Sequence, residues 1–339
     1  MRGFEQSRAL FARAANNLRQ PHEDPFCSAA TTRLIYGGAV WYRRAVAQSD
    51  RLEMRSSAAK SALIVDGHNL LCACYYGLPD RIRSVTGEPI HGTYGFVAAV
   101  LKMIRRFEPQ ALVVCFDAEE PNFRNALSPT YNANRTLLPE RGNPFAQLPD
   151  IRRGLAWLKV PWLEIAGVEA DDVMGTLARR LAKTHRVYIA SMDRDLFQLV
   201  DKRTRVYSRA FGIEIEYGPR EIVTRYKVRP DQFVDYRTLV GDASDNIEGV
   251  DGIGAKTAAR LLKDFGDIPG IVANLGTLRP RIAAALAESR ERMELSKQLI
   301  TIRTDLENEL LEGDFSFSTE TCPGTLSVRT VMREIGLMT

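Results

Sequence analysis

Short runs of consecutive apolar residues recur along the chain from residue 61 onward, and aspartates follow each run. The three clearest runs are residues 62–65 before Asp66, residues 112–116 before Asp117, and residues 187–190 before Asp193 and Asp195. Wholly apolar runs of this length are typical of central strands in a parallel sheet that is covered on both faces. Helical patterns such as residues 92–107 separate the runs, so the sequence predicts an α/β fold.

The aspartates after these runs are expected to lie close together, because ligands of open parallel sheets bind beyond the carboxyl ends of the strands. An aspartate after a single strand usually caps a turn or a helix. The same feature after three successive strands makes independent capping a much weaker explanation. These aspartates therefore indicate a site at one edge of the sheet.

The segment "GVEADDVMGTLARRLA" adds more acidic residues at the start of an amphipathic helix. Its apolar stripe has helical spacing and consists of Val173, Leu177 and Leu181. Glu169 and Asp172 lie three positions apart and share a face, with Asp171 beside them. Acids in a first helical turn also complement the helix dipole, by about 0.3 to 1 kcal/mol each. That effect explains one or two acids better than three.

Nine carboxylates are candidates for a single site, since two more precede a glycine-rich turn. They are Asp66, Asp117, Glu169, Asp171, Asp172, Asp193, Asp195, Asp242 and Asp245. So many acids would repel one another, and some would take up protons, unless cations were bound. All-oxygen ligands suit Mg²⁺ or Mn²⁺, whereas zinc would recruit the histidines and cysteines that are scattered here. Two such ions about 3.5 to 4 Å apart can activate a water and stabilise a leaving oxygen, so phosphodiester hydrolysis is the predicted reaction.

The glycine-rich turn, "GVDGIGAKTAARLL" at residues 249–262, is not a P-loop, because a residue separates Gly254 from Lys256. It fits a helix-hairpin-helix, in which Gly252 and Gly254 allow a tight turn and the next helix presents its N-terminus to a phosphate. Lys256 and Thr257 can add side-chain contacts. Such a turn binds the DNA backbone without reading bases. A plain glycine turn between two packed helices is the alternative.

Five stretches resemble the successive motifs of one known family. They are "LIVDGHN", "VVCFDAEEPNFR", "GVEADDVMGTLA", "MDRDLFQLV" and "GDASDNIEGVDGIGAKTAARLL". In order and content they are similar to the 5′-nuclease domain of bacterial DNA polymerase I and its flap-endonuclease relatives, over about residues 61–310. The resemblance implies an α/β, PIN-like parallel-sheet nuclease core with a helical arch, and an all-helical helix-3-turn-helix (helix-hairpin-helix) domain that holds duplex DNA.

The resemblance divides the chain into four segments. They are a poorly ordered extension at 1–60, the nuclease core at 61–220 with the arch at about 121–150, the helix-3-turn-helix domain at 221–312, and a C-terminal tail at 313–339. Because only this tail follows, we expect a stand-alone 5′-nuclease without a polymerase. The extension is rich in arginine, as transit peptides are, but it carries acids that they usually avoid. An organellar signal and an over-extended reading frame ahead of Met54 both stay open.

The resemblance also implies a role for each acidic residue. The ligands of the first metal would be Asp66, Asp117, Glu169, Asp171 and Asp172, and those associated with the second would be Asp193, Asp195, Asp242 and Asp245. In this family the glycine hairpin commonly holds a K⁺ ion that bridges to a DNA phosphate.

The arch matches the family's catalytic pattern at Arg124, Tyr131 and Arg135, with one departure. The family shows Tyr-Lys-x-x-Arg, whereas here Tyr131 is followed by Asn132. The lysine helps to polarise the scissile phosphate, so we expect slow catalysis unless Arg124 and Arg135 compensate. We interpret His68 as a local hydrogen-bonding residue and not as a metal ligand, because hard ions prefer oxygen.

The composition excludes few kinds of binding partner. The 46 basic and 42 acidic residues give a net charge of +4, so any basic surface for nucleic acid must be local. The five cysteines form no C-x-x-C pair and are interpreted as reduced and structural. No apolar run reaches the roughly 18 to 20 residues of a membrane helix, and we expect a soluble protein of the bacterial cytoplasm or of an organelle.

We therefore expect a divalent-metal-dependent 5′-3′ exonuclease and 5′-flap endonuclease that acts as a monomer on DNA with 5′ ends, flaps or junctions. RNA-primed DNA is a further candidate substrate. The alternative is a DNA-junction binding protein with weak or no catalysis, which Asn132 favours and the full set of carboxylates disfavours. A phosphatase built on Asp193 and Asp195 would leave the other carboxylates unexplained.

Overall fold

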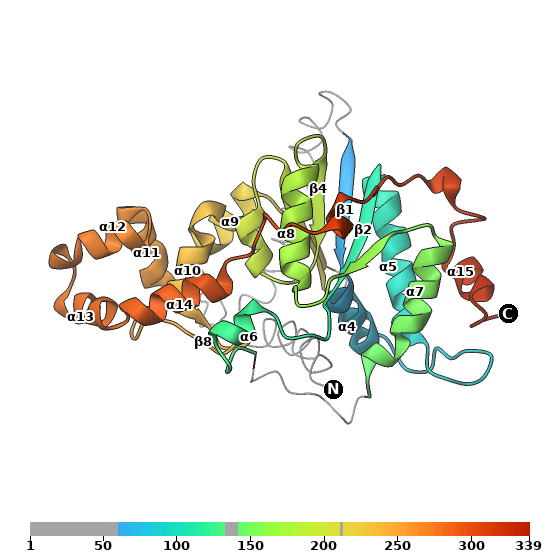
Figure 1. Ribbon diagram of the computed structural model, residues 1–339, viewed down its shortest axis with the longest axis horizontal. Coiled ribbons are helices and arrows are strands. Elements are labelled where there is room, and N and C mark those ends of the chain that lie inside the picture. The colour runs from blue at the N-terminus through green and yellow to red at the C-terminus, as the bar shows by residue number, and fades with distance from the viewer. Residues whose placement is uncertain (1–59, 133–141, 211–212) are drawn as a thin grey trace, which may run out of the picture.

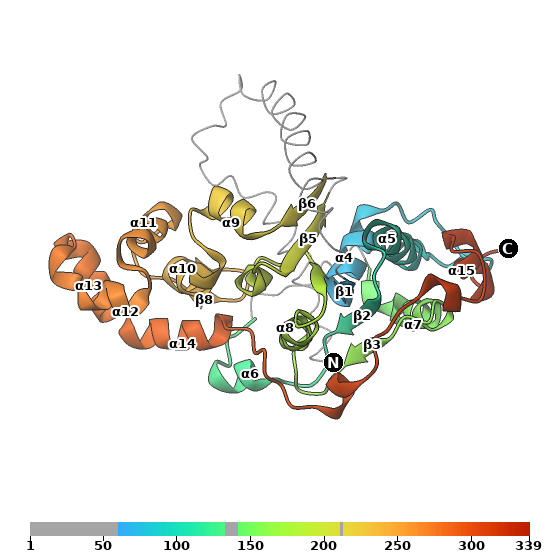
Figure 2. The ribbon, with the colours of Figure 1, turned by 90° about the horizontal axis from the view of Figure 1, so that it is seen from above.

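The computed structural model describes residues 60–132, 142–210 and 213–339. Its centre is a six-stranded sheet of order β3-β2-β1-β4-β5-β6, parallel throughout except for the pair β5 and β6 (Figure 1 and Figure 2). The strands are β1 (Ser61–Asp66), β2 (Ala111–Phe116), β3 (Trp162–Glu164), β4 (Arg186–Ala190), β5 (Thr204–Ala210) and β6 (Ile213–Tyr217). The helices between them are α4 (Gly67–Gly77), α5 (His91–Phe107), α6 (Phe123–Leu127), α7 (Leu148–Trp157) and α8 (Ala170–Leu181).

The three apolar runs form the adjacent strands β2, β1 and β4 at the centre of the sheet, as the sequence predicts. Successive residues of a strand point to opposite faces. Leu63 and Val65 accordingly pack into a core with α4, α5 and α7, while Ala62 and Ile64 pack into a second core with α8. Covering both faces is what an apolar parallel sheet requires.

A helical domain follows β6 and extends to the left in Figure 1. It contains α9 (Pro219–Tyr226), α10 (Phe233–Val240), α11 (Ala255–Phe265), α12 (Ile268–Ala273), α13 (Pro280–Glu288) and α14 (Arg290–Ile300). Two short antiparallel strands, β7 (Gly241–Asp242) and β8 (Ile247–Glu248), lie between α10 and α11. Helix α10 packs against both α11 and α14. The predicted combination of an α/β core with a helical domain is confirmed.

Residues 313–339, expected to be a tail, return to the nuclease core and pack on it. Phe315 accepts a hydrogen bond from the N–H of Leu112 at 2.9 Å, which adds one rung beside β2. Helix α15 (Val328–Glu334) buries Val331 and Met332 against α5 and α7. The segment was missed because its apolar residues lie on separate short turns, without the sustained period that identifies an element.

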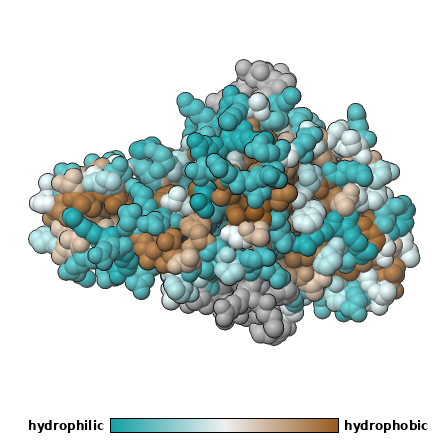
Figure 3. All heavy atoms as spheres, viewed as in Figure 1, coloured by the Kyte–Doolittle hydropathy of each residue, from teal (hydrophilic) through white to brown (hydrophobic). Residues whose placement is uncertain are grey.

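None of the helices in the described ranges is both long and apolar enough to cross a bilayer. On the face shown in Figure 3, hydrophilic residues dominate and hydrophobic residues form separate small areas. The cysteines of the described ranges form no disulfide bonds with one another: they are Cys72, Cys74, Cys115 and Cys322. The expectations for residues 1–59 lie outside the described residues.

Candidate functional site

The first acidic group lies where β1 and β2 end. Asp66 is the last residue of β1 and is 2% exposed. Its Oδ1 accepts the N–H of Asn69 at 3.0 Å, which caps α4, and its Oδ2 accepts the Ser191 hydroxyl at 2.7 Å. Burial first, and then the charge of Asp117, raise the pKa of Asp66 from 3.8 to about 6. Helix capping and acid clustering therefore occur together at this aspartate.

Asp117 follows β2 directly and joins it to α8. Its Oδ1 accepts the N–H of the first α8 residue at 2.8 Å, and its Oδ2 lies 3.3 Å from Nδ1 of His68. His68 thus makes the local contacts expected of it. After burial, the charges of Asp66, Asp117 and Asp171 raise the pKa of the Cys115 thiol, so all three acids lie near this strand end.

A chain of hydrogen bonds connects this group to a second one at the end of β4. The Ser191 hydroxyl donates to Asp66 and accepts the N–H of Asp193 at 3.0 Å. Asp193 in turn accepts the N–H of Asp195 on its Oδ1 at 2.9 Å. Both aspartates are buried. The strand end therefore fixes the position of one acidic group relative to the other.

Three aspartates of the second group lie together and are buried: Asp195, Asp242 and Asp245. One carboxylate oxygen from each lies within 4.8 Å of the others. The ligands of a single Mg²⁺ ion are at most about 4.2 Å apart, twice the metal–oxygen distance, so small side-chain rotations would bring the three oxygens to one ion. The purely oxygen ligand set and the mutual repulsion at Asp66 both fit hard divalent cations.

Arg237, which no sequence pattern indicated, also contacts the second group. Its Nε donates to Oδ1 of Asp195 at 3.0 Å, and its Nη2 donates to Oδ2 of Asp242. The guanidinium thus bridges two of the three aspartates.

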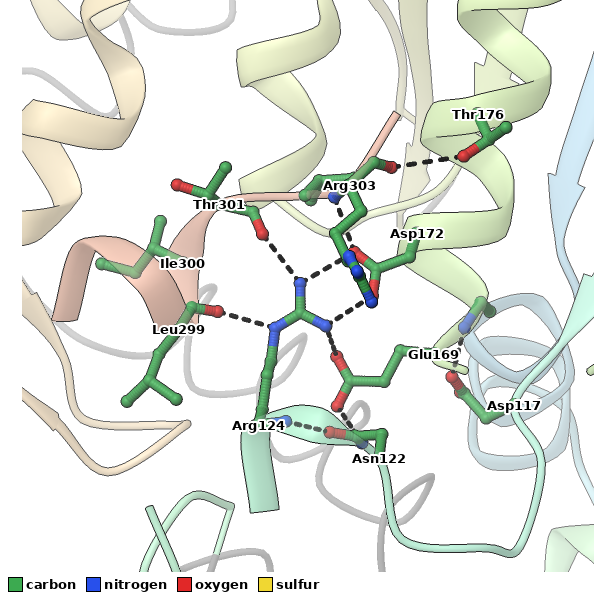
Figure 4. Close-up of polar contacts among 12 residues, drawn as sticks. Asp117, Asn122, Arg124, Glu169, Asp172, Thr176, Leu299, Ile300, Thr301 and Arg303 are labelled. Atoms are coloured by element: carbon green, nitrogen blue, oxygen red, sulfur yellow. Dashed lines mark hydrogen bonds and ion pairs between the residues drawn. The ribbon is translucent and has the colours of Figure 1, made fainter. Parts of the chain in front are cut away.

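Arg124 lies at the centre of a separate buried network (Figure 4). Its Nη1 and Nη2 bind both oxygens of Asp172 at 2.7 and 2.8 Å, and Nη1 also binds Glu169 at 2.9 Å. Its Nε and Nη2 donate to the carbonyls of Leu299 and Thr301 at 2.8 and 2.9 Å. Burial opposes the charge of Arg124, but Glu169 and Asp172 outweigh burial and raise the pKa of the guanidinium.

Four residues of this network contact protein groups that the sequence did not indicate. They are Arg124, Asp172, Glu169 and Tyr131. Arg124 is 2% exposed and faces Asp172 instead of open space for a phosphate. Asp172 also accepts the N–H of Arg303, which lies just after α14, at 2.8 Å. Its oxygens therefore hold α6 and the segment after α14 against α8. Glu169 is bound by Arg124 and by Asn122, and the buried Tyr131 places its hydroxyl 3.4 Å from Glu169. These contacts hold Asp172 and Glu169 beside the acidic groups, and they join α6 to α8.

The glycine turn lies at the surface of the helical domain. Gly252 has a φ of +75°, which favours glycine, and Ile253 donates to the carbonyl of Val250 at 3.0 Å. A Cβ added at Gly252 or Gly254 would meet no atom within 4 Å, so both border open space. Lys256 is exposed in the first turn of α11, with the partly exposed Thr257 next to it.

Two family models match consecutive parts of the chain. The 5′-3′ exonuclease N-terminal resolvase-like domain matches residues 61–227, and the 5′-3′ exonuclease C-terminal SAM fold matches residues 228–321. The chain belongs to the 5′-3′ exonuclease family. The matches cover the sheet, both acidic groups and the glycine turn.

Relatives within this family include DNA polymerases I. The chain is 38% identical to the thermostable DNA polymerase I of Thermus thermophilus over 255 residues, and 37% identical to the DNA polymerase I of Deinococcus radiodurans over 254 residues. These matches cover 75% and 74% of the chain but only 29% and 26% of the polymerases. The chain thus spans less than a third of these relatives.

Solved structures confirm the exonuclease-family fold. A bacteriophage T5 flap endonuclease in a complex with DNA and metal ions aligns with a TM-score of 0.63 at 22% identity, over 81% of this chain and 98% of that one. The catalytic core of Rad2 with a DNA substrate aligns with a TM-score of 0.51 at 14% identity, over 81% and 88%. At these identities the likeness concerns the fold.

Asn132, which occupies the position where the sequence leads us to expect a lysine of the family, borders the second acidic group. Its N–H donates to the carbonyl of Asp245 at 3.1 Å, and its φ is +61°. The side chain is buried, and neither amide atom has a hydrogen-bond partner among the described residues. Arg135, the next arch residue singled out in the sequence, lies outside the described residues.

Proposed function

We propose that this protein is a divalent-metal-dependent 5′-3′ exonuclease and 5′-flap endonuclease that hydrolyses phosphodiester bonds of DNA in replication or repair. The observation that carries the proposal is the pair of acidic groups at the carboxyl edge of a parallel sheet, connected through Ser191. A module that only binds DNA would gain nothing from buried carboxylates beside phosphate, because they repel it. Membership in the exonuclease family supports the same activity.

Each acidic group would hold one Mg²⁺ or Mn²⁺ ion. Asp66, Asp117 and Asp171 are the residues suited to the first ion, and Asp193, Asp195, Asp242 and Asp245 are those suited to the second. Bound ions supply Lewis-acid stabilisation of the phosphate and an activated water. The chain itself contributes position: Ser191 fixes Asp66 relative to Asp193, and the Arg124 network holds α6 against α8 beside the first group.

The glycine turn would bind the DNA backbone away from the bond that is cut. Gly252 and Gly254 leave open space in which a phosphate can approach the backbone, and Lys256 and Thr257 add a charge and a hydroxyl at the start of α11. A K⁺ ion held at this turn would add positive charge beside the same phosphate. Because Asp245 and Gly252 are close in sequence, the distance from the bound phosphate to the acidic groups would be fixed.

A second candidate function is a DNA-junction binding protein with weak catalysis. Asn132 favours it, because this position beside Asp245 carries no positive charge. The two acidic groups, connected through Ser191, argue for catalysis. The two functions differ in one observable, which is metal-dependent cleavage.

The test uses a 5′-flap DNA substrate labelled at its 5′ end, incubated with the full chain and with Mg²⁺, Mn²⁺ or a chelator. Cleavage that needs the metal and is lost in Asp117→Asn and Asp193→Asn supports the nuclease. Junction binding by all three proteins without cleavage would favour the binding function. Nicked, gapped and RNA-primed substrates, run in parallel, establish the preferred substrate.

A further inference from the structure

The second acidic group contains a positive charge of its own. Arg237 lies in the last turn of α10, and its side chain is 13% exposed. The guanidinium takes one oxygen of Asp195 and one of Asp242, and its Nη1 donates to the carbonyl of Gly241 at 3.2 Å. Asp195 belongs to the nuclease core and Arg237 to the helical domain, so this contact also joins the two.

An arginine in this position cannot withdraw by losing its proton, because the guanidinium stays charged at any working pH. It offsets part of the repulsion among Asp195, Asp242 and Asp245 when no cation is present. It also takes up one oxygen of Asp195 and one of Asp242, which are two of the three carboxylates that a divalent cation would share. The same side chain therefore stabilises the metal-free group and opposes the ion.

We propose that Arg237 is the resident counter-ion of the second acidic group and sets how tightly this group holds a divalent cation. The inference rests on the proposed function, which places a cation there. A guanidinium that contacts two ligands lies about 5 Å from an ion bound between them, and a charge of +1 repels one of +2 at that distance even with water-like screening. Arg237 is a positioning residue, since it acts through Asp195 and Asp242.

The sign of the effect separates this role from ordinary structural support. Losing a residue that only supports the site would weaken metal binding, because Asp195 and Asp242 would lose their positions. Losing a competing counter-ion would strengthen it. At about 5 Å and water-like screening, the repulsion corresponds to an affinity change of at least roughly tenfold.

The experiment is a calorimetric titration of the full chain with Mn²⁺ alone, without DNA. We expect Asp245→Asn to bind fewer ions than the wild type, and Arg237→Met to keep the wild-type number while one site binds at least about tenfold more tightly. Arg237→Lys keeps the positive charge without the planar guanidinium, and its Mn²⁺ affinity should be close to that of the wild type. Arg229→Met is the matched control, because Arg229 is exposed and pairs with Asp231 two residues away; it should change nothing.

Failures of the two proposals give different results. If Asp245→Asn binds as many Mn²⁺ ions as the wild type, the metal assignment is wrong and the inference falls with it. If Asp245→Asn loses a site but Arg237→Met binds Mn²⁺ with equal or weaker affinity, the assignment stands and the counter-ion role of Arg237 is overturned.

Thermal unfolding gives a second, independent measurement. Metal-free Arg237→Met should unfold at a lower temperature than the wild type, and saturating Mn²⁺ should raise its midpoint by more than it raises that of the wild type. An equal or smaller rise would contradict the inference. Should Arg237→Met fail to fold, Arg237→Gln keeps hydrogen-bond donors without the charge and undergoes the same two measurements.

Discussion

Replacing Arg124 by methionine should cause a large loss of stability. Arg124 is 2% exposed and holds both oxygens of the buried Asp172 and one of Glu169. Methionine fills similar volume but removes the cation that faces both carboxylates, which keep Asn122, Tyr131 and the N–H of Arg303 among their partners. Breaking a buried ion pair by removing one partner costs about 3 to 5 kcal/mol. For a chain of this size this corresponds to a midpoint lower by roughly 4 to 7 °C.

Urea unfolding followed by circular dichroism measures this loss, with Arg153→Met as the matched control. Arg153 pairs with Asp150 on an exposed helix surface at 2.6 Å, so its loss should cost less than about 1 kcal/mol. The double variant Arg124→Met with Asp172→Leu also removes the carboxylate that loses its cation. Its loss of unfolding free energy should therefore be smaller than the sum of the losses of the two single variants. A cost below about 1 kcal/mol for Arg124→Met, or strict additivity in the double variant, would refute the structural role of Arg124.

Three further predictions concern the acidic site and the DNA contacts. Because the pKa of Asp66 is raised from 3.8 to about 6, the contribution of this carboxyl to folding stability is complete below pH 3.8 and is lost as pH rises through 6. Metal-free Asp66→Asn should therefore be more stable than the wild type at pH 7, by about 3 kcal/mol. At pH 3.5 the two proteins should not differ in stability. Equal thermal midpoints at both pH values would contradict the raised pKa. Lys256→Ala should weaken duplex binding uniformly across sequences and lower the slope of log affinity against log salt concentration by about 0.9. Lys263→Ala, at the far end of α11, should have less effect on both quantities. Fluorescence anisotropy measures the affinity, and a loss that depends on the DNA sequence would rule out backbone binding. Asn132→Lys should raise the single-turnover rate of flap cleavage by up to about 100-fold, by analogy with a lost transition-state donor. Lysine at a positive φ should lower the folding stability by roughly 1 kcal/mol. An unchanged or lower cleavage rate would show that the arch does not lack this charge.

The apolar runs predicted the central strands because strands buried on both faces need continuous apolar sequence, which is a local signal. The positions of Asp66, Asp117 and Asp193 follow from these strand ends. Strand β3, only three residues long, carries too few positions for a period to appear.

The sequence could not reveal which arginines pair with which acids. Arg124 reaches Asp172 and the end of α14, and Arg237 reaches Asp195, across separations of 48, 175 and 42 residues. Only the packing of α6, α8, α10 and α14 brings these partners together. The motif match predicts a role for Arg124 at the phosphate, and the structure adds that this side chain is buried and holds both oxygens of Asp172.

The most direct test of hydrolysis at the acidic groups is cleavage of a 5′-flap substrate in water enriched in ¹⁸O, with Mg²⁺ present and a single turnover of the enzyme. Mass spectrometry of the products gives the position of the label. The proposed function predicts one ¹⁸O atom in the 5′-phosphate of the duplex product, a 3′-hydroxyl on the released flap, and no product from Asp117→Asn or Asp193→Asn. Absence of cleavage by the wild type, or a product without label in its 5′-phosphate, would contradict it.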